Sequence, residues 1–159
     1  MLANFIVKEL EQIDFEILEQ FLYAAIFQPD PENLIPFSAI KGPDLSKYIE
    51  HFGQKPGDFA IGALAGEEVV ALVWVRLVKG YGHVDLSTPE LNISVLEDYR
   101  GQGLGHILME KMLDKLAVEG FKKVSLSVQK ANRALKLYQA LGFGVHAEDE
   151  ETYTMVYVF

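Results

Sequence analysis

The chain has no cysteine and little positive charge, and each shortage excludes a class of protein. Without cysteine there is no disulfide framework, no thiolate nucleophile and no cysteine-based zinc site. The 14 Lys and Arg stand against 23 Asp and Glu, a formal net charge of −9 that argues against nucleic acid or an anionic membrane surface as a partner. No apolar run approaches the roughly 18 residues of a membrane span, and MLANFIVKELEQ lacks the regions of a signal peptide. We therefore expect a cytoplasmic protein.

Length and charge distribution set further limits. A chain of 159 residues with 50% hydrophobic residues supports one well-buried core, so we expect a single domain over 1–159. Residues 100–136 hold eight of the 14 basic residues and three acidic ones, a local charge of +5 against −14 elsewhere. This asymmetry indicates an anionic small ligand at one place and a cationic substrate at another. A solvated helix face is the simpler alternative for the same pattern.

The hydrophobic pattern predicts alternating strands and helices without an internal repeat. Four of the six prolines fall in residues 28–43, which predicts a long loop that either covers a pocket or merely connects its neighbours. The expected strands are 4–10, 59–66, 67–78, 91–96 and 122–128 with a closing hairpin over 143–158, and the expected helices are 14–27, 44–52, 104–120 and 132–142.

The stretch EDYRGQGLGH, residues 97–106, places three glycines between a predicted strand and a predicted helix. This order points backbone N–H groups and the positive end of a helix dipole at one place, which is typical of a phosphate site. A dinucleotide fingerprint would need glycine where His106 stands, and the lysine and hydroxyl residue of a P-loop are absent. The remaining pattern is Arg100-x-x-Gly103-x-Gly105, for which a purely structural turn is the alternative.

Two segments together resemble one known family. LNISVLEDYRGQGLGHILMEKML and NRALKLYQALGF, within residues 91–143, are similar to the signature of the GNAT superfamily of N-acetyltransferases that use acetyl-CoA. The usual proline after the strand is replaced by Glu97. The resemblance implies an α/β (α+β) fold with a mixed, mostly antiparallel sheet of six to seven strands. It also implies a splay between strands 4 and 5 and about four flanking helices.

The resemblance further implies a site for acetyl-CoA as acetyl donor. Backbone groups of the strand would pair with the pantetheine arm, and the amides of the glycine turn would hold the pyrophosphate. Asn132 matches a family asparagine that contacts the cofactor, although a helix N-cap is its alternative role. The residues so implied are Ile93, Ser94, Val95, Arg100, Gly101, Gln102, Gly103, Leu104, Gly105, His106 and Asn132.

The resemblance also implies catalytic roles. The Val95 N–H would polarise the thioester carbonyl, and a fixed donor of this kind contributes roughly 3 kcal/mol to lowering a barrier. Tyr138 would act as general acid toward the departing thiolate, or else is an ordinary core residue. Some relatives carry a glutamate base where this chain has Ser127. The base candidates are therefore Asp85, Glu90 and His83, each with a surface role as alternative, or a chain of waters.

The sequence thus predicts an N-acetyltransferase that moves an acetyl group from acetyl-CoA directly to an amine. The histidines at 51, 83, 106 and 146 show no metal-ligand spacing, so we expect no metal. The acidic remainder of the chain favours a cationic acceptor, and many members of the family are dimers, so a homodimer is one expected assembly. The alternatives are a non-catalytic acyl-CoA-binding regulatory module and, against the failed motifs, a nucleotide-binding regulatory domain.

Overall fold

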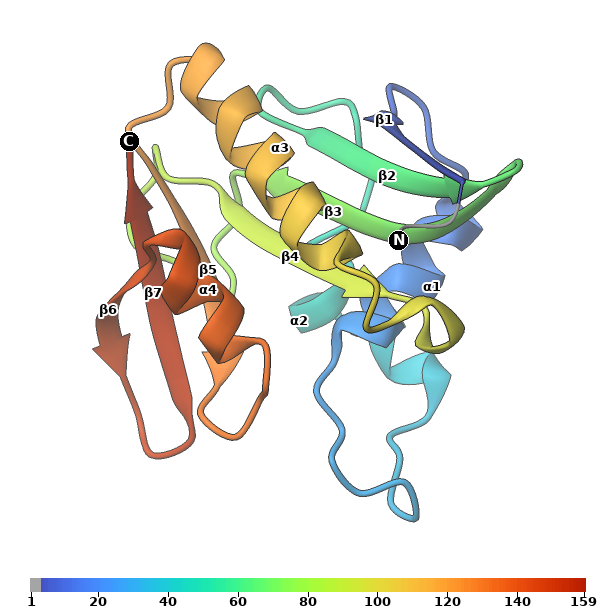
Figure 1. The fold of residues 1–159 in the computed structure, drawn as a ribbon. Coiled ribbons are helices and arrows are strands. Elements are labelled where there is room, and N and C mark those ends of the chain that lie inside the picture. The colour runs from blue at the N-terminus through green and yellow to red at the C-terminus, as the bar shows by residue number, and fades with distance from the viewer. Residues whose placement is uncertain (1–3) are drawn as a thin grey trace.

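A computed structural model describes residues 4–159, and a seven-stranded sheet runs through its centre (Figure 1). The strand order is β1-β2-β3-β4-β5-β7-β6, and every neighbouring pair is antiparallel except β4 and β5. The expected mixed, mostly antiparallel sheet is therefore confirmed. The strands are β1 (Phe5–Glu9), β2 (Phe59–Ala65), β3 (Glu68–Arg76), β4 (Glu90–Val95), β5 (Lys123–Gln129), β6 (Gly144–Glu148) and β7 (Thr152–Val158).

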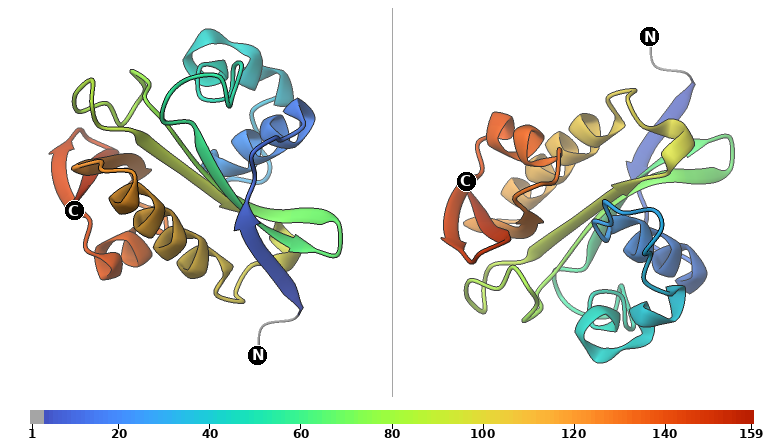
Figure 2. Two further views of the ribbon diagram at one scale, coloured as in Figure 1. Left: turned by 90° about the horizontal axis from the view of Figure 1, so that it is seen from above. Right: turned by 90° about the horizontal axis from the view of Figure 1, so that it is seen from below.

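Helices cover both faces of the sheet. Figure 2 shows α3 and α4 on one side of the strands and α1 and α2 on the other. In β3 the side chains of Val73 and Val75 pack toward the α3 side, while Leu72 and Trp74 belong to the core on the α1 side. This alternation is the two-residue period of a strand buried on both faces. The helices are α1 (Phe15–Ala25), α2 (Pro43–Ser46), α3 (Leu104–Val118) and α4 (Leu135–Leu141), with short 3-10 helices η1 (Phe37–Lys41) and η2 (Glu97–Tyr99).

The helix expected over 44–52 is largely wrong. Only Pro43–Ser46 forms an α-helix, and the chain then continues as a series of turns to Gly53. The buried Arg76 side chain donates to the carbonyl oxygens of Lys47 and Glu50, so these groups are satisfied by a side chain from β3 without a regular helix. The long loop over 28–43 is also interrupted, because η1 begins directly after Pro36.

The two central parallel strands separate almost as soon as they meet. In the described chain β4 and β5 pair at one register position only, Glu90 against Ser125. The Ser125 N–H donates to the carbonyl oxygen of Pro89 at 2.9 Å, and beyond this point β5 pairs with β7 on its other side. The expected splay between strands 4 and 5 is therefore present and leaves one edge of β4 open.

Candidate active site

The open edge of β4 presents the backbone groups of alternate residues. The Leu96 N–H donates to the carbonyl oxygen of Val70 at 2.9 Å, so even-numbered positions of this strand direct their backbone groups toward β3. By the same alternation, Ile93 and Val95 direct theirs toward the gap. Ser94 is turned the other way: its backbone faces β3, and its hydroxyl donates to the carbonyl oxygen of Phe21 at 2.8 Å. Two of the three strand residues predicted for the cofactor thus face the gap.

The glycine turn lies at the end of this edge and leads into α3. Gly101 and Gly103 have φ angles of +77° and +82°, in the left-handed region that favours glycine. Gly103 is the N-cap of α3, so the free amides of the first helical turn follow directly. The Arg100 Nε donates to the carbonyl oxygen of Val95 at 3.0 Å and ties the turn back to the strand.

Gly105 differs from the two turn glycines. A Cβ added there would lie 3.6 Å from the nearest Leu137 carbon, an ordinary contact, so the fold itself tolerates a side chain at this position. Among the other predicted residues of the motif, Leu104 is buried and can offer a ligand only its backbone. Gln102 is half-buried, while His106 is exposed and its Nε2 contacts the Glu110 carboxylate one helical turn away. The turn therefore offers mainly backbone donors.

A cavity of about 650 Å³ opens on the α1–α2 face of the sheet, between residues of β4 and β5. One part of its wall is apolar and comes from α1, the following loop and α2. Its carboxylates are those of Glu90, Glu148 and Asp149, and no lysine, arginine or histidine is among the described residues that line it. The apolar lining residues are Leu22, Ala25, Ile26, Phe27, Ile35 and Leu45.

Of the three predicted base candidates, only Glu90 lines this cavity. Its carboxylate is 2% exposed and is held by three donors. The Gly80 N–H donates to Oε2 at 2.6 Å, and the Gly82 N–H and the Tyr48 hydroxyl donate to Oε1 at 2.9 and 3.0 Å. A carboxylate offers about four acceptor sites, so one remains on Oε2. The arrangement provides a fixed carboxylate that can accept one further proton or hydrogen bond.

Asp85 and His83 lie elsewhere. The Asp85 carboxylate accepts hydrogen bonds from Ser87, from the Thr88 hydroxyl and from Lys123 Nζ. These donors, the Thr88 hydroxyl first, hold the pKa of Asp85 well below its usual range. His83 is exposed, and neither residue is among those that line the cavity in residues 4–159. Asp85 is thus engaged in organising the loop before β4.

Tyr48, which sequence reasoning missed, is the partner of Glu90 in the cavity wall. Burial, together with the nearby negative charge of Glu90, raises the pKa of the Tyr48 hydroxyl. A signal was present in the stretch GYG at 80–82. A Cβ on Gly80 would fall 1.9 Å from the Tyr48 hydroxyl, and one on Gly82 would fall 2.9 Å from the backbone of Leu126. Only glycine allows these close approaches.

The predicted general acid, Tyr138, lies in α4 on the opposite face from Glu90. Its ring is 8% exposed and packs against Phe143, with 6.0 Å between the ring centroids. Burial raises the pKa of Tyr138 to about 12, so the hydroxyl keeps its proton at neutral pH. Asn132 lines the cavity, and its Oδ1 accepts the Ala134 N–H at 2.9 Å, in the turn before α4. The N-cap of α4 is Ala134, without a side-chain cap hydrogen bond, so the N-cap role given as the alternative for Asn132 is wrong. Asn132 holds the turn before the helix instead, and its cofactor role stays a prediction.

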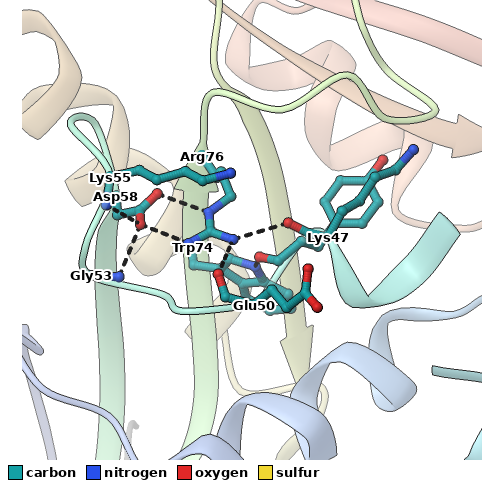
Figure 3. Close-up of polar contacts among 8 residues, drawn as sticks. Lys47, Glu50, Gly53, Lys55, Asp58, Trp74 and Arg76 are labelled. Atoms are coloured by element: carbon teal, nitrogen blue, oxygen red, sulfur yellow. Dashed lines mark hydrogen bonds and ion pairs between the residues drawn. The ribbon is translucent and has the colours of Figure 1, made fainter. Parts of the chain in front are cut away.

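A buried ion pair fixes the segment that carries Tyr48. Figure 3 shows Arg76 between Asp58 on one side and the backbone of Lys47 and Glu50 on the other. The Arg76 Nε and Nη2 donate to the two Asp58 oxygens at 3.0 and 2.8 Å, and both side chains are almost fully buried. Such a two-bond pair fixes orientation as well as distance.

Residues 4–159 contain neither a candidate metal cluster nor a helix that could span a membrane. No cluster of three or more His, Cys, Asp or Glu is placed to hold a metal ion there. No helix of that part of the chain is both long enough and apolar enough to cross a membrane.

The site thus combines an open strand edge, a glycine turn at a helix N-terminus and a splayed pair of parallel strands. The sequence profile of the Acetyltransferase (GNAT) family matches residues 20–143. The chain therefore belongs to the GNAT acetyltransferase family, as the motifs at 91–143 indicated.

Individual relatives agree with this placement. The chain is 43% identical over 53 residues to the "[Ribosomal protein bS18]-alanine N-acetyltransferase" of Escherichia coli K12, a match that covers 33% of this chain and 36% of that protein. Its match thus spans about a third of the curated relative. The structure of the PaiA N-acetyltransferase from Thermoplasma acidophilum in complex with coenzyme A aligns with a TM-score of 0.73 at 14% identity, over 97% of this chain and 99% of that one. The ribosomal-protein-S18-alanine N-acetyltransferase structure from Escherichia coli aligns at 0.68 and 20% identity, over 97% and 93%. At these identities the structural matches show the shared fold.

Proposed function

We propose that residues 1–159 act as one domain that transfers the acetyl group of acetyl-CoA to an amine. The observation that carries this proposal is that two groups of backbone donors lie along one side of the sheet: the open edge of β4 and the glycine turn at the start of α3. The amides of Ile93 and Val95 would pair with the pantetheine arm as an added strand would. The amides of Gly101 to His106 would hold the pyrophosphate at the N-terminus of α3. The coenzyme A complex of the Thermoplasma relative supports this choice of donor.

Acetyl transfer needs an acid and a base on either side of the thioester. An amine nitrogen attacks the carbonyl carbon, the carbon–sulfur bond breaks, and the thiolate leaves with a proton. Glu90, in the cavity wall, is our candidate to receive the proton that the amine loses. Tyr138, on the other face, is our candidate to protonate the sulfur. The Val95 N–H would stabilise the negative charge that develops on the carbonyl oxygen.

The cavity lining supports a cationic acceptor with an apolar body. Its three carboxylates are Glu90, Glu148 and Asp149, of which Glu148 is already paired with Lys130 at 2.6 Å. The aliphatic and aromatic side chains of the opposite lining would contact carbon atoms of the acceptor. The bS18-alanine name of the Escherichia coli relative adds the N-terminal amine of a protein as a candidate. Polyamines are the small-molecule candidates.

Thermal unfolding with acetyl-CoA, CoA, ATP and NAD tests the donor. A ligand at about one hundred times its dissociation constant adds roughly 2.7 kcal/mol of stability, so binding raises the melting temperature measurably. We expect acetyl-CoA and CoA to raise it and ATP and NAD to leave it unchanged. The opposite pattern would refute the proposal.

Turnover is then tested by thiol release with a panel of amines: spermidine, a neutral aromatic amine and a peptide with an N-terminal alanine. Acetyl-CoA binding without release for any of them would support a non-catalytic acyl-CoA-binding module instead. We expect release with spermidine or the peptide, and less with the neutral amine.

A further inference from the structure

One buried hydroxyl, that of Tyr48, connects the candidate base to a loop far away in sequence. It donates to Glu90 Oε1 at 3.0 Å and accepts the Tyr81 N–H at 2.7 Å. It therefore sits between the carboxylate and the backbone that wraps around it. Without this hydroxyl, Oε1 would keep a single donor, the N–H of Gly82.

The backbone of Tyr48 is held from β3. The indole Nε1 of Trp74 donates to the Tyr48 carbonyl oxygen at 3.2 Å. The Arg76 Nη1 holds the carbonyl oxygens of Lys47 and Glu50, one residue before and two residues after Tyr48, at 3.0 and 2.6 Å. Figure 3 shows the contacts of Lys47 and Glu50 meeting at Arg76, which is also paired with Asp58. Side chains of β3 therefore fix the backbone that carries the Tyr48 ring.

The same strand also sets the position of Glu90. Arg76 and Glu90 are register partners across the β3–β4 ladder, so their side chains leave the sheet on the same face. The buried Arg76 side chain contacts Asp58 and the backbone of Lys47 and Glu50. The Tyr48 hydroxyl contacts Glu90. The glycine at position 80 fits because a Cβ there would come within 1.9 Å of the Tyr48 hydroxyl and 2.8 Å of Glu90 Oε1.

We infer that Tyr48 is a positioning residue that, held by Arg76 and Trp74, fixes the Glu90 carboxylate so that its free Oε2 site accepts the proton of the acceptor amine. This inference rests on the proposed acetyl transfer. The other ionisable groups around Glu90 are Tyr81, from the loop before β4, and Arg76, from β3. Lys47, from the segment after α2, is also close: its Nζ donates at 2.8 Å to the carbonyl oxygen of Lys79, in the same peptide group whose N–H, that of Gly80, donates to Glu90 Oε2.

A double-mutant cycle of Tyr48→Phe and Glu90→Gln tests the inference. We expect Tyr48→Phe to lower kcat/KM for acetyl transfer about tenfold, the effect of one hydrogen bond on a barrier. We also expect it to move the acidic limb of the kcat/KM–pH profile to higher pH, because a carboxylate that has lost a donor binds a proton more readily. In the Glu90→Gln background the same substitution should cost nothing more, since Tyr48 acts through Glu90.

The matched control is Tyr157→Phe, which removes a hydroxyl in β7 away from the cavity and should leave both the rate and the pH profile as in the wild type. An equal loss from Tyr48→Phe in both backgrounds, or an unmoved acidic limb, would overturn the inference. Melting temperatures of the wild type and all four variants show whether any loss comes from unfolding.

Amide hydrogen exchange at Gly80 and Gly82 provides a readout that needs no turnover. Their N–H groups bind the Glu90 carboxylate, so a carboxylate released by Tyr48→Phe should let both exchange faster than in the wild type. Unchanged exchange would overturn the positioning role. Faster exchange in Tyr48→Phe, together with a wild-type protein that acetylates no amine, would keep the positioning of Glu90 and refute the acetyl transfer, so the two failures are distinguishable.

Discussion

Replacing Asp58 by Asn tests the contribution of the buried ion pair to stability. The substitution keeps one acceptor oxygen but removes the negative charge that compensates Arg76, whose side chain is 1% exposed. It also weakens the hydrogen bonds from the N–H groups of Gly53 and Lys55, which bind Asp58 Oδ2 at 2.9 and 3.2 Å. The loss of stability therefore arises mainly from one buried cation, the Arg76 guanidinium, that has lost its counter-charge.

Removal of one partner of a buried pair costs about 3–5 kcal/mol, and the retained oxygen places Asp58→Asn near the lower end, about 3 kcal/mol. In a chain of this length 1 kcal/mol corresponds to roughly 2–4 °C, so the melting temperature should fall by roughly 6–12 °C. Breaking an exposed pair costs much less, about 0–1 kcal/mol.

Urea unfolding followed by tryptophan fluorescence measures this directly, because Trp74 is the sole tryptophan, is fully buried and lies beside Arg76 (Figure 3). Glu119→Gln is the control, since it breaks the partly exposed i, i+4 pair with Lys115 in the last turn of α3. A cost below about 1 kcal/mol for Asp58→Asn, equal to that of the control, would refute the reasoning.

Three further predictions concern the site. Gly105→Ala should leave the melting temperature unchanged but weaken CoA binding in calorimetry, whereas Gly103→Ala should cost about 1–2 kcal/mol because its φ is +82°. Tyr138→Phe should lower kcat about a hundredfold without loss of stability. Because burial raises the pKa of Tyr138 to about 12, the wild-type kcat should not fall through ionisation of this hydroxyl until the pH nears 12. Because the pKa of Asp85 is held below its unfolded value, its stabilising effect is present at neutral pH and lost on acidification below about pH 4. Asp85→Asn should therefore flatten the acid part of the stability–pH curve and leave kcat/KM near wild type, and a large loss of kcat/KM would contradict the assignment of Glu90 as base.

The elements with strong local signals were predicted correctly. The alternating and apolar strands, the long helix that starts at Leu104 and the turn before it follow from patterns within a few residues. The helix over 44–52 failed because a distant side chain, Arg76, takes its carbonyl oxygens. The helix propensity of residues 44–52 carries no information about these hydrogen bonds, since Arg76 lies 26 to 29 residues away in the sequence.

The same distinction between local and long-range determinants applies to the site. The glycine turn and the strand before it can be recognised from the sequence, because their chemistry belongs to the backbone of one continuous segment. The tertiary structure decided which of Asp85, Glu90 and His83 faces the cavity. That depends on which side chains of β4 and of the loop before it point into the cavity.

The sequence by itself determined the family, the glycine turn and most of the strands and helices, because these depend on local backbone conformation and periodic burial. The tertiary structure alone decided the pairing of Tyr48 with Glu90 and its support by Arg76, because these contacts join segments up to 42 residues apart. They exist only once β3 and β4 are aligned in register and the chain after α2 has packed against them.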